Sequence, residues 1–184
     1  MIYPMREIEV KAKLRNKASF LAAAEQLGIK FGEAIAQDDA TYETDLPYAD
    51  PNWNIFRIRA QNGQQILTMK HKASTRSRDN HEYETIIEDS SEIVKMLNRL
   101  GYTLGVRVRK DRRIAHYMGL EICLDELDEL ESFVEVEKLA NDDADVDAVQ
   151  DELWTLLSRL GIHADDRVHK GYDTLMRQLI SGAA

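Results

Sequence analysis

Apolar and charged side chains alternate along several short segments of this chain. In residues 7–14, Glu7 and Glu9 alternate with Ile8 and Val10. Because successive side chains of a β-strand point to opposite faces, this segment predicts a strand with one charged and one apolar face. Alternating or extended patterns predict further strands over residues 37–44, 55–61, 65–72, 81–88, 120–127 and 133–137.

Apolar residues at helical spacing predict four helices between these strands. The predicted helices cover residues 17–27, about 90–100, 146–160 and about 169–180. Ser90 or Ser91 is expected to cap the second helix, because a serine hydroxyl accepts a hydrogen bond from a free backbone N–H. Asn62-Gly63 is typical of a two-residue hairpin turn. The elements together predict an α+β protein with an antiparallel, hairpin-rich sheet.

A Glu-x-Glu unit occurs three times along the chain. The units are Glu7-Ile8-Glu9, Glu82-Tyr83-Glu84 and Glu135-Val136-Glu137. Each is followed by a helical pattern that ends in Leu-Gly, at residues 27–28, 100–101 and 160–161. The spacing is too irregular for a solenoid. The repeat therefore predicts strand-then-helix units placed around a shared centre.

Composition limits the classes of protein that this chain can form. Its 184 residues fit one domain, residues 1–184, that is long enough for a hydrophobic core. The net charge of -9 argues against non-specific nucleic-acid binding. Cys123 is the only cysteine, which fits a reducing cytoplasm, and no apolar run is long enough to span a membrane. The sequence leaves the oligomeric state open, with a homodimer among the alternatives.

Sorting the charges by strand face separates acids from bases. Acids share faces at Glu7 and Glu9, Glu82 and Glu84, Glu121 and Asp125, and Glu135 and Glu137; bases do so at Lys11, Arg57 and Arg59, Lys70 and Lys72, and Lys110 and Arg112. If the sheet closes into a barrel with helices outside, these faces point inward. Such a lumen must hold water and ions, because unpaired buried charge is costly. A triphosphate with divalent cations satisfies both signs of charge. The competing interpretation is an open sheet with solvated charged faces.

These residues resemble the CYTH superfamily, the triphosphate tunnel metalloenzymes. The resemblance covers nearly the whole chain and rests on six segments in the family's order. They are Glu7-x-Glu9-x-Lys11, Phe56-Arg57-Ile58-Arg59, Leu67-Thr68-Met69-Lys70, Lys110-Asp111-Arg112, Ile122-Cys123-Leu124-Asp125 and Phe133-Val134-Glu135-Val136-Glu137. The resemblance implies a closed, eight-stranded antiparallel β-barrel with helices packed outside.

The resemblance also implies the site residues. A Mg²⁺ or Mn²⁺ ion is expected on Glu7, Glu9, Asp125, Glu135 and Glu137. The phosphates are expected on Lys11, Arg57, Arg59, Lys70, Lys72, Lys110 and Arg112, of which Lys11, Lys70 and Arg59 are the expected catalytic residues. Many members have Gly-Pro after the strand lysine, whereas this chain has His71-Lys72, so the role of Lys72 stays open. Glu82 and Glu84 are expected to hold basic side chains in place.

Three functions remain open at this point. Hydrolysis of thiamine triphosphate, tripolyphosphate or a nucleotide is favoured. The first alternative is a class IV adenylyl cyclase, in which the ribose 3′-hydroxyl attacks the α-phosphorus of ATP and pyrophosphate leaves. The second is a non-catalytic binder of polyphosphate or nucleotide. Membership of a family does not determine which reaction takes place.

Overall fold

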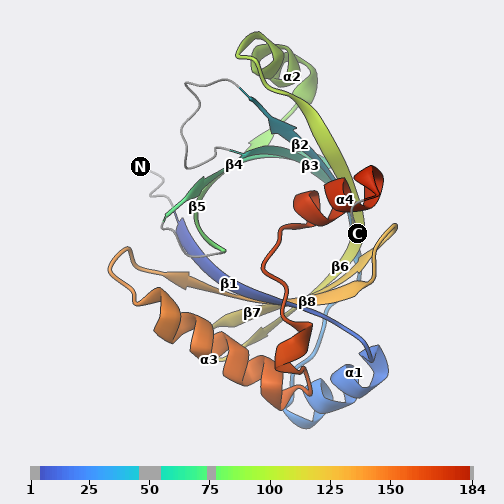
Figure 1. Ribbon diagram of the computed structural model, residues 1–184, viewed down its shortest axis with the longest axis vertical. Helices are drawn as coiled ribbons and strands as arrows, with labels where there is room; N and C mark the ends of the chain where they lie inside the picture. Colours follow the sequence, from blue (N-terminus) through green and yellow to red (C-terminus); the bar gives the residue numbers. More distant parts are fainter. Residues whose placement is uncertain (1–4, 46–54, 74–77, 183–184) are drawn as a thin grey trace.

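The chain forms a ring of eight strands in the computed structural model, which describes residues 5–45, 55–73 and 78–182 (Figure 1). The strands are β1 (Met5–Lys13), β2 (Ile35–Glu43), β3 (Ile55–Gln61), β4 (Gln64–Lys72), β5 (Asp79–Ile87), β6 (Thr103–Tyr117), β7 (Leu120–Leu127) and β8 (Ser132–Ala140). All neighbours pair antiparallel, in the closed order β1-β5-β4-β3-β2-β6-β7-β8. The predicted closed antiparallel barrel and α+β class are confirmed.

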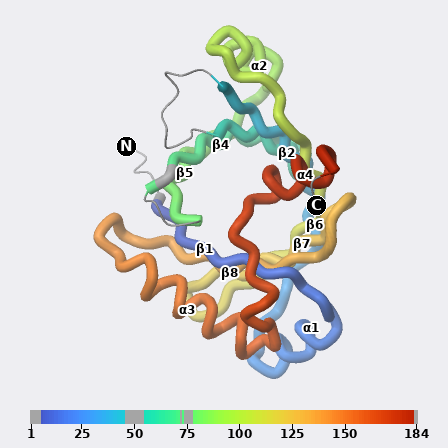
Figure 2. Tube along the Cα trace, viewed as in Figure 1, coloured from blue at the N-terminus to red at the C-terminus, as the bar shows by residue number. Residues whose placement is uncertain are grey.

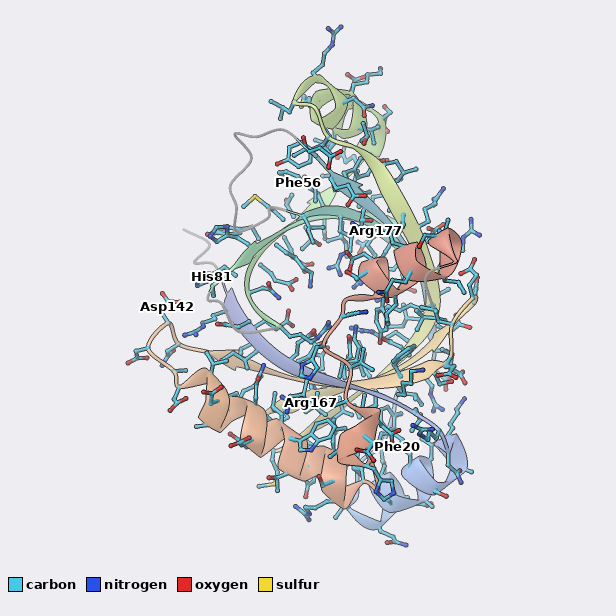
Figure 3. The ribbon with its side chains drawn as sticks, viewed as in Figure 1. Phe20, Phe56, His81, Asp142, Arg167 and Arg177 are labelled. Atoms are coloured by element: carbon cyan, nitrogen blue, oxygen red, sulfur yellow. The ribbon has the colours of Figure 1, made fainter. Side chains whose placement is uncertain are left out.

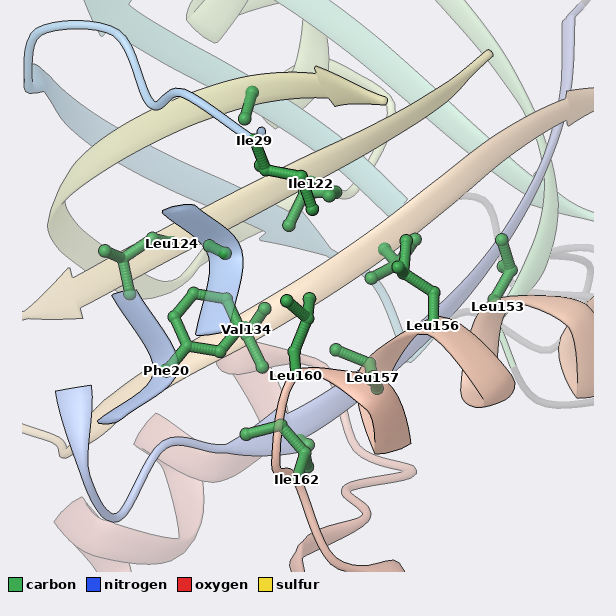
Figure 4. Close-up of a cluster of buried hydrophobic side chains, with 14 of the residues drawn as sticks. Phe20, Ile29, Ile122, Leu124, Val134, Leu153, Leu156, Leu157, Leu160 and Ile162 are labelled. Carbon is green, nitrogen blue, oxygen red and sulfur yellow. The ribbon is translucent and has the colours of Figure 1, made fainter. Parts of the chain in front are cut away.

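Helices cover two sides of the barrel's outer surface. They are α1 (Lys17–Gln26), α2 (Ser90–Arg99) and α3 (Val146–Arg159). The outward side chains of β1, such as Val10 and Ala12, share one core with α1 and α3. Figure 4 shows Phe20 of α1 and Leu157 of α3 in this core. On another side, Leu97 of α2 packs with Tyr42 and Ile58. Burial of this apolar surface, at about 25 cal/mol per Å², turns the charged strand faces toward the interior.

The fourth helix, α4 (Tyr172–Ser181), lies differently from the other three. Val106 and Val108 share the face of β6 that carries Lys110, and Met176 of α4 packs against them. Figure 2 shows the chain passing from α3 beside β1 to reach α4, and the N–H of Val168 donates to the Lys11 carbonyl at 2.8 Å. The expectation of outside helices therefore holds for α1, α2 and α3. Because this end of β6 is apolar on its inner face, α4 covers it from within.

The three predicted strand-then-helix units are present and lie side by side. They are β1 with α1, β5 with α2 and β8 with α3, and β1 pairs with both β5 and β8. Each helix is followed by a glycine with positive φ, namely Gly28 at 74°, Gly101 at 84° and Gly161 at 83°. This left-handed conformation ends the helix at little cost in glycine. The repeat thus places all three Glu-x-Glu segments on adjacent strands.

Some boundaries differ from the predictions. Asp89, not Ser90 or Ser91, caps α2, since its carboxylate accepts from the Ser91 N–H at 2.8 Å. The basic segment belongs to a longer strand, β6, of 15 residues. The hairpin turn is confirmed, with φ of 49° at Asn62 and 73° at Gly63. Within the described ranges, no helix has the length and apolar character needed to cross a bilayer.

Candidate active site inside the barrel

The inner faces of β1 and β8 bring three carboxylates together. In the ladder, Glu9 lies opposite Glu137 and Lys11 lies opposite Glu135. Glu9, Glu135 and Glu137 each offer an oxygen, and these oxygens lie within 4.8 Å of one another. We call these three residues the acidic cluster. Grouped carboxylate oxygens are preferred ligands of hard divalent cations, so the cluster fits the metal that the resemblance implies.

Glu7 adds a fourth carboxyl group beside this cluster. Burial, with the nearby charges of Glu137 and Glu82, raises the pKa of Glu7 to about 11. Burial and the neighbouring carboxylates together keep this carboxyl group protonated, and the carboxylate contribution marks an excess of negative charge. A cation placed here would relieve that excess, which is a second reason why these residues fit a metal.

Asp125, and Glu135 of the acidic cluster, hold the basic side chains of β1 and β6. Asp125 accepts a forked pair of bonds from Arg112, at 2.7 and 2.6 Å, and one bond from Lys110 at 3.0 Å. Glu135 is paired with Lys11 at 2.8 Å and with Arg112. Burial alone would raise the pKa of both carboxyl groups, but the cations outweigh it and hold both below their usual range. Asp125, predicted as a metal ligand, therefore contacts bases with both of its oxygens.

Tyr172, at the start of α4, joins this group from the C-terminal part of the chain. Its hydroxyl donates to Asp125 at 2.8 Å. The ammonium groups of Lys11 and Lys110 lie 3.3 and 4.7 Å from the centre of its ring. Burial lowers the pKa of Lys11, and lowers that of Lys110 to about 8. Tyr172 was not predicted as a site residue, because nothing in the helical pattern of α4 shows that one of its side chains enters the barrel.

The basic side chains of β3 are held by carboxylates of β2 and β5. Arg59 makes a forked pair of bonds to Asp39, at 2.6 and 2.8 Å. Arg57 donates to Glu84 at 3.1 Å. Burial would raise the pKa of Asp39, but the nearby Arg59 and Arg57 hold it well below its usual range. Asp39 was missed at the sequence level, although the strand predicted over residues 37–44 places it on a polar face.

Strand β4 contributes Lys70, which is paired with Glu82 of β5. Burial would raise the pKa of Glu82, but Lys70 and other groups lower it to about 2. The contacts of Glu82 and Glu84 agree with the expectation that this pair holds basic side chains. Lys72 ends β4, but its side chain lies outside the described part of the structure.

Two other side chains complete the interior. Cys123 is buried, and burial raises the pKa of its thiol far above the usual range, which leaves it unsuited to act as a nucleophile. Arg78, just before β5, donates to Glu135 at 3.0 Å and is also paired with Glu9. Sequence reasoning did not identify Arg78, because the residues before it show no alternation.

Figure 3 shows side chains projecting from the surrounding strands into the ring, with Arg177 of α4 at its edge. The ion pairs and the carboxylate cluster connect the predicted site residues across these strands. These residues are Glu7, Glu9, Lys11, Arg57, Arg59, Lys70, Lys110, Arg112, Asp125, Glu135 and Glu137. The site therefore has an acidic side on β8 and β1 and a basic side on β4 and β3, with the bases of β6 between them.

Known proteins share this architecture. A Methanocaldococcus jannaschii protein named "putative adenylate cyclase" is 29% identical over 170 residues, which cover 91% of this chain and 97% of that protein. A solved structure from Pyrococcus horikoshii has a TM-score of 0.78 at 25% identity, over 92% of this chain and 98% of that one. A Hippeastrum structure described as a "putative adenylyl cyclase" with a dominant triphosphatase activity has a TM-score of 0.61 over 97% and 96% of the two chains; its 16% identity indicates the fold alone.

The CYTH domain family matches residues 5–172, nearly the whole chain. That range runs from the first residue of β1 to Tyr172 and so includes all eight strands and the site residues described above. The chain therefore belongs to the CYTH domain family.

Proposed function

We propose that this protein is a divalent-metal-dependent enzyme that binds a triphosphate inside the barrel and hydrolyses it. The observation that carries the proposal is the division of one interior into two sides of opposite charge. The carboxylate oxygens of the acidic cluster lie within 4.8 Å of one another on β1 and β8. Arg57, Arg59 and Lys70 lie on the other side, on β3 and β4, and Arg112 of β6 borders the cluster through Glu135 and Glu137. A polyphosphate with bound cations is complementary to both sides.

Each group of side chains then has a distinct role. Glu9, Glu135 and Glu137, with Glu7 beside them, would hold Mg²⁺ or Mn²⁺, which would neutralise charge on the phosphate oxygens. Arg57 and Arg59 bind and orient the phosphates through planar forks, as guanidinium groups do.

Burial lowers the pKa of Lys11 and so favours its neutral amine, the form that would accept the proton of the attacking water. The contacts with Glu135 and the ring of Tyr172 fix the Lys11 nitrogen beside the acidic cluster. Attack by water on the terminal phosphorus then yields orthophosphate and the shortened chain. Asp125 acts through Lys110 and Arg112, whose positions it determines.

The second candidate is the adenylyl cyclase reaction. It is supported by the 29% identical relative, whose name assigns it to the adenylate cyclases. The same charged interior would bind ATP, and the 3′-hydroxyl of the ribose would replace water as the nucleophile. The two reactions differ in which phosphorus atom is attacked.

A product assay separates these candidates. Purified protein is incubated with Mg²⁺ or Mn²⁺ and, separately, with tripolyphosphate, thiamine triphosphate or ATP. Orthophosphate from any of them supports the hydrolase, whereas cyclic AMP with pyrophosphate from ATP supports the cyclase. Tight binding of tripolyphosphate without any product would contradict both reactions and leave a non-catalytic binder. The Arg59→Ala protein tests whether the basic side chains bind the phosphates, since it should bind tripolyphosphate more weakly by about tenfold or more.

A further inference from the structure

Arg78 has a backbone conformation that its surroundings do not explain. Its φ is +62°, in the left-handed region that L-residues rarely adopt. The other described non-glycine residues with positive φ are Asn62 and Met118, and each of these is followed by a glycine in a tight hairpin turn. Arg78 is followed by Asp79 at the start of β5. Unfavourable backbone conformations of this kind gather at functional sites, where other contacts maintain them.

The contacts of Arg78 lead into the acidic cluster. The Glu9 N–H donates to the Arg78 carbonyl at 3.1 Å, which fixes the backbone beside β1. One terminal nitrogen, Nη2, lies 3.0 Å from Glu135 Oε1 and is also paired with Glu9 Oε1. The other, Nη1, donates to the carbonyl of Lys170 at 3.1 Å. The side chain is only 13% exposed, so the guanidinium is an inner cation of the barrel and also a tether of the C-terminal segment.

Arg78 uses the same oxygens that a bound metal would need. Glu9 and Glu135 belong to the acidic cluster, and Arg78 contacts an oxygen of each. Glu135 is also paired with Lys11 through Oε1 and with Arg112 through Oε2. A divalent cation bound by the cluster would therefore be repelled by Arg78 at close range. Lys11 and Arg112 lie within paired strands, whereas Arg78 lies just before β5, so Arg78 is the cation that a metal would displace.

We propose that Arg78 is the resident counter-cation of the acidic cluster, that a divalent cation displaces it, and that the displaced guanidinium then binds the triphosphate. The last step rests on the proposed function. A guanidinium fork matches a pair of phosphate oxygens, so the released group has a partner in the same interior. Among the described residues, the buried Nε of Arg78 has no hydrogen-bond partner, which leaves one donor for such a ligand. Movement of Arg78 would also release the Lys170 carbonyl, and so couple metal binding to the segment that carries Tyr172.

The test compares Arg78→Gln with the wild type and with a control, Arg107→Gln. Arg107 is exposed and bonds to Asp38 on the outer face, so the control loses the same charge outside the interior. Binding of Mn²⁺ alone is measured first by calorimetry, and binding of tripolyphosphate is measured next in saturating Mn²⁺. Arg78→Gln should bind Mn²⁺ about threefold to tenfold more tightly, because a competing cation has been removed. It should bind tripolyphosphate about tenfold more weakly, because a charged donor has been lost.

Tighter binding of Mn²⁺ together with weaker binding of tripolyphosphate distinguishes this role of Arg78 from a structural one. Weaker or unchanged binding of Mn²⁺ would overturn the proposal, and tighter Mn²⁺ binding with unchanged tripolyphosphate binding would overturn the transfer to phosphate. If the wild type itself does not bind tripolyphosphate, the proposed function fails, while the Mn²⁺ measurement still tests the counter-cation. Arg78→Lys keeps the charge but not the planar guanidinium group, so its Mn²⁺ affinity should lie between those of the wild type and Arg78→Gln. Circular dichroism of each variant checks that the barrel is folded.

Discussion

At the scale of single residues, the interior is built from opposite charges that are buried together. Asp125 and Glu135 are almost fully shielded from water, and each contacts two or more cationic side chains. Removing one partner of such a pair costs about 3–5 kcal/mol, because the other charge stays buried. Asp125 thus serves to hold bases, Glu135 both holds bases and belongs to the acidic cluster, and Glu7 carries negative charge that no cation balances well.

Glu7 gives this imbalance a measurable pH dependence. Its pKa is about 11 in the folded protein, against 4.5 for the free group. Between these values the folded state keeps a proton that the unfolded state has lost, so this group lowers stability as pH rises from about 4.5. Glu7→Gln should therefore raise the melting temperature in EDTA, by about 2–4 °C near neutral pH. Thermal unfolding between about pH 5 and pH 9 measures the difference in melting temperature between Glu7→Gln and the wild type, which should widen as pH rises.

The control for this prediction is Glu152→Gln on α3. Glu152 pairs with Lys138 on the surface, and its loss should leave the pH dependence unchanged. A Glu7→Gln protein that melts below the wild type at alkaline pH would show that Glu7 is ionised and paired in the folded state.

At the scale of elements, the strands supply charge and the C-terminal segment arranges it. The ammonium groups of Lys11 and Lys110 come from different strands and meet at one aromatic ring, that of Tyr172. The ring also packs edge-on against Phe133, at 5.3 Å between centroids. Cation–π contacts are strongest when the cation is shielded from water. The first turn of α4 is thus part of the site as well as its cover.

Tyr172→Phe isolates the hydroxyl of this residue. The ring and its contacts with the two lysines remain, but Asp125 loses a donor. Because hydrogen bonds to charged groups contribute about 1.5–3 kcal/mol, the free energy of unfolding should fall by that amount. Chemical denaturation measures the change, with Tyr83→Phe on the half-exposed face of β5 as the control. Equal stability of the wild type and Tyr172→Phe would mean that water replaces the hydroxyl, and that α4 does not seal this side of Asp125.

At the scale of the whole molecule, alternation predicted the faces of the strands, and the resemblance to the CYTH superfamily implied that the sheet closes into the barrel that the structure has. Alternation assigns each strand side chain to a face, and the closed sheet turns one face of every strand to the same interior. This reasoning brings Glu9 and Arg59 to the same interior although they are far apart along the chain. It fails for Tyr172 and Arg78, which come from a helix start and a connection. Their positions depend on how the segments outside the strands return to the barrel, and the alternation of apolar and polar residues does not predict that path.

The closed barrel also predicts how the whole chain responds to metal. The acidic cluster exists only when β1 and β8 are paired, so a divalent cation should bind the folded state and not the unfolded chain. At a concentration of about 100 times its dissociation constant, Mn²⁺ should then add about 2.7 kcal/mol to the free energy of unfolding. Glu137→Gln should remove this gain, yet should not destabilise the protein in EDTA, because it removes one of several crowded carboxylates. Thermal unfolding of both proteins with Mn²⁺ and with EDTA gives the four values needed. If Mn²⁺ stabilises the two proteins equally, the ion binds elsewhere and the acidic cluster is not the metal site.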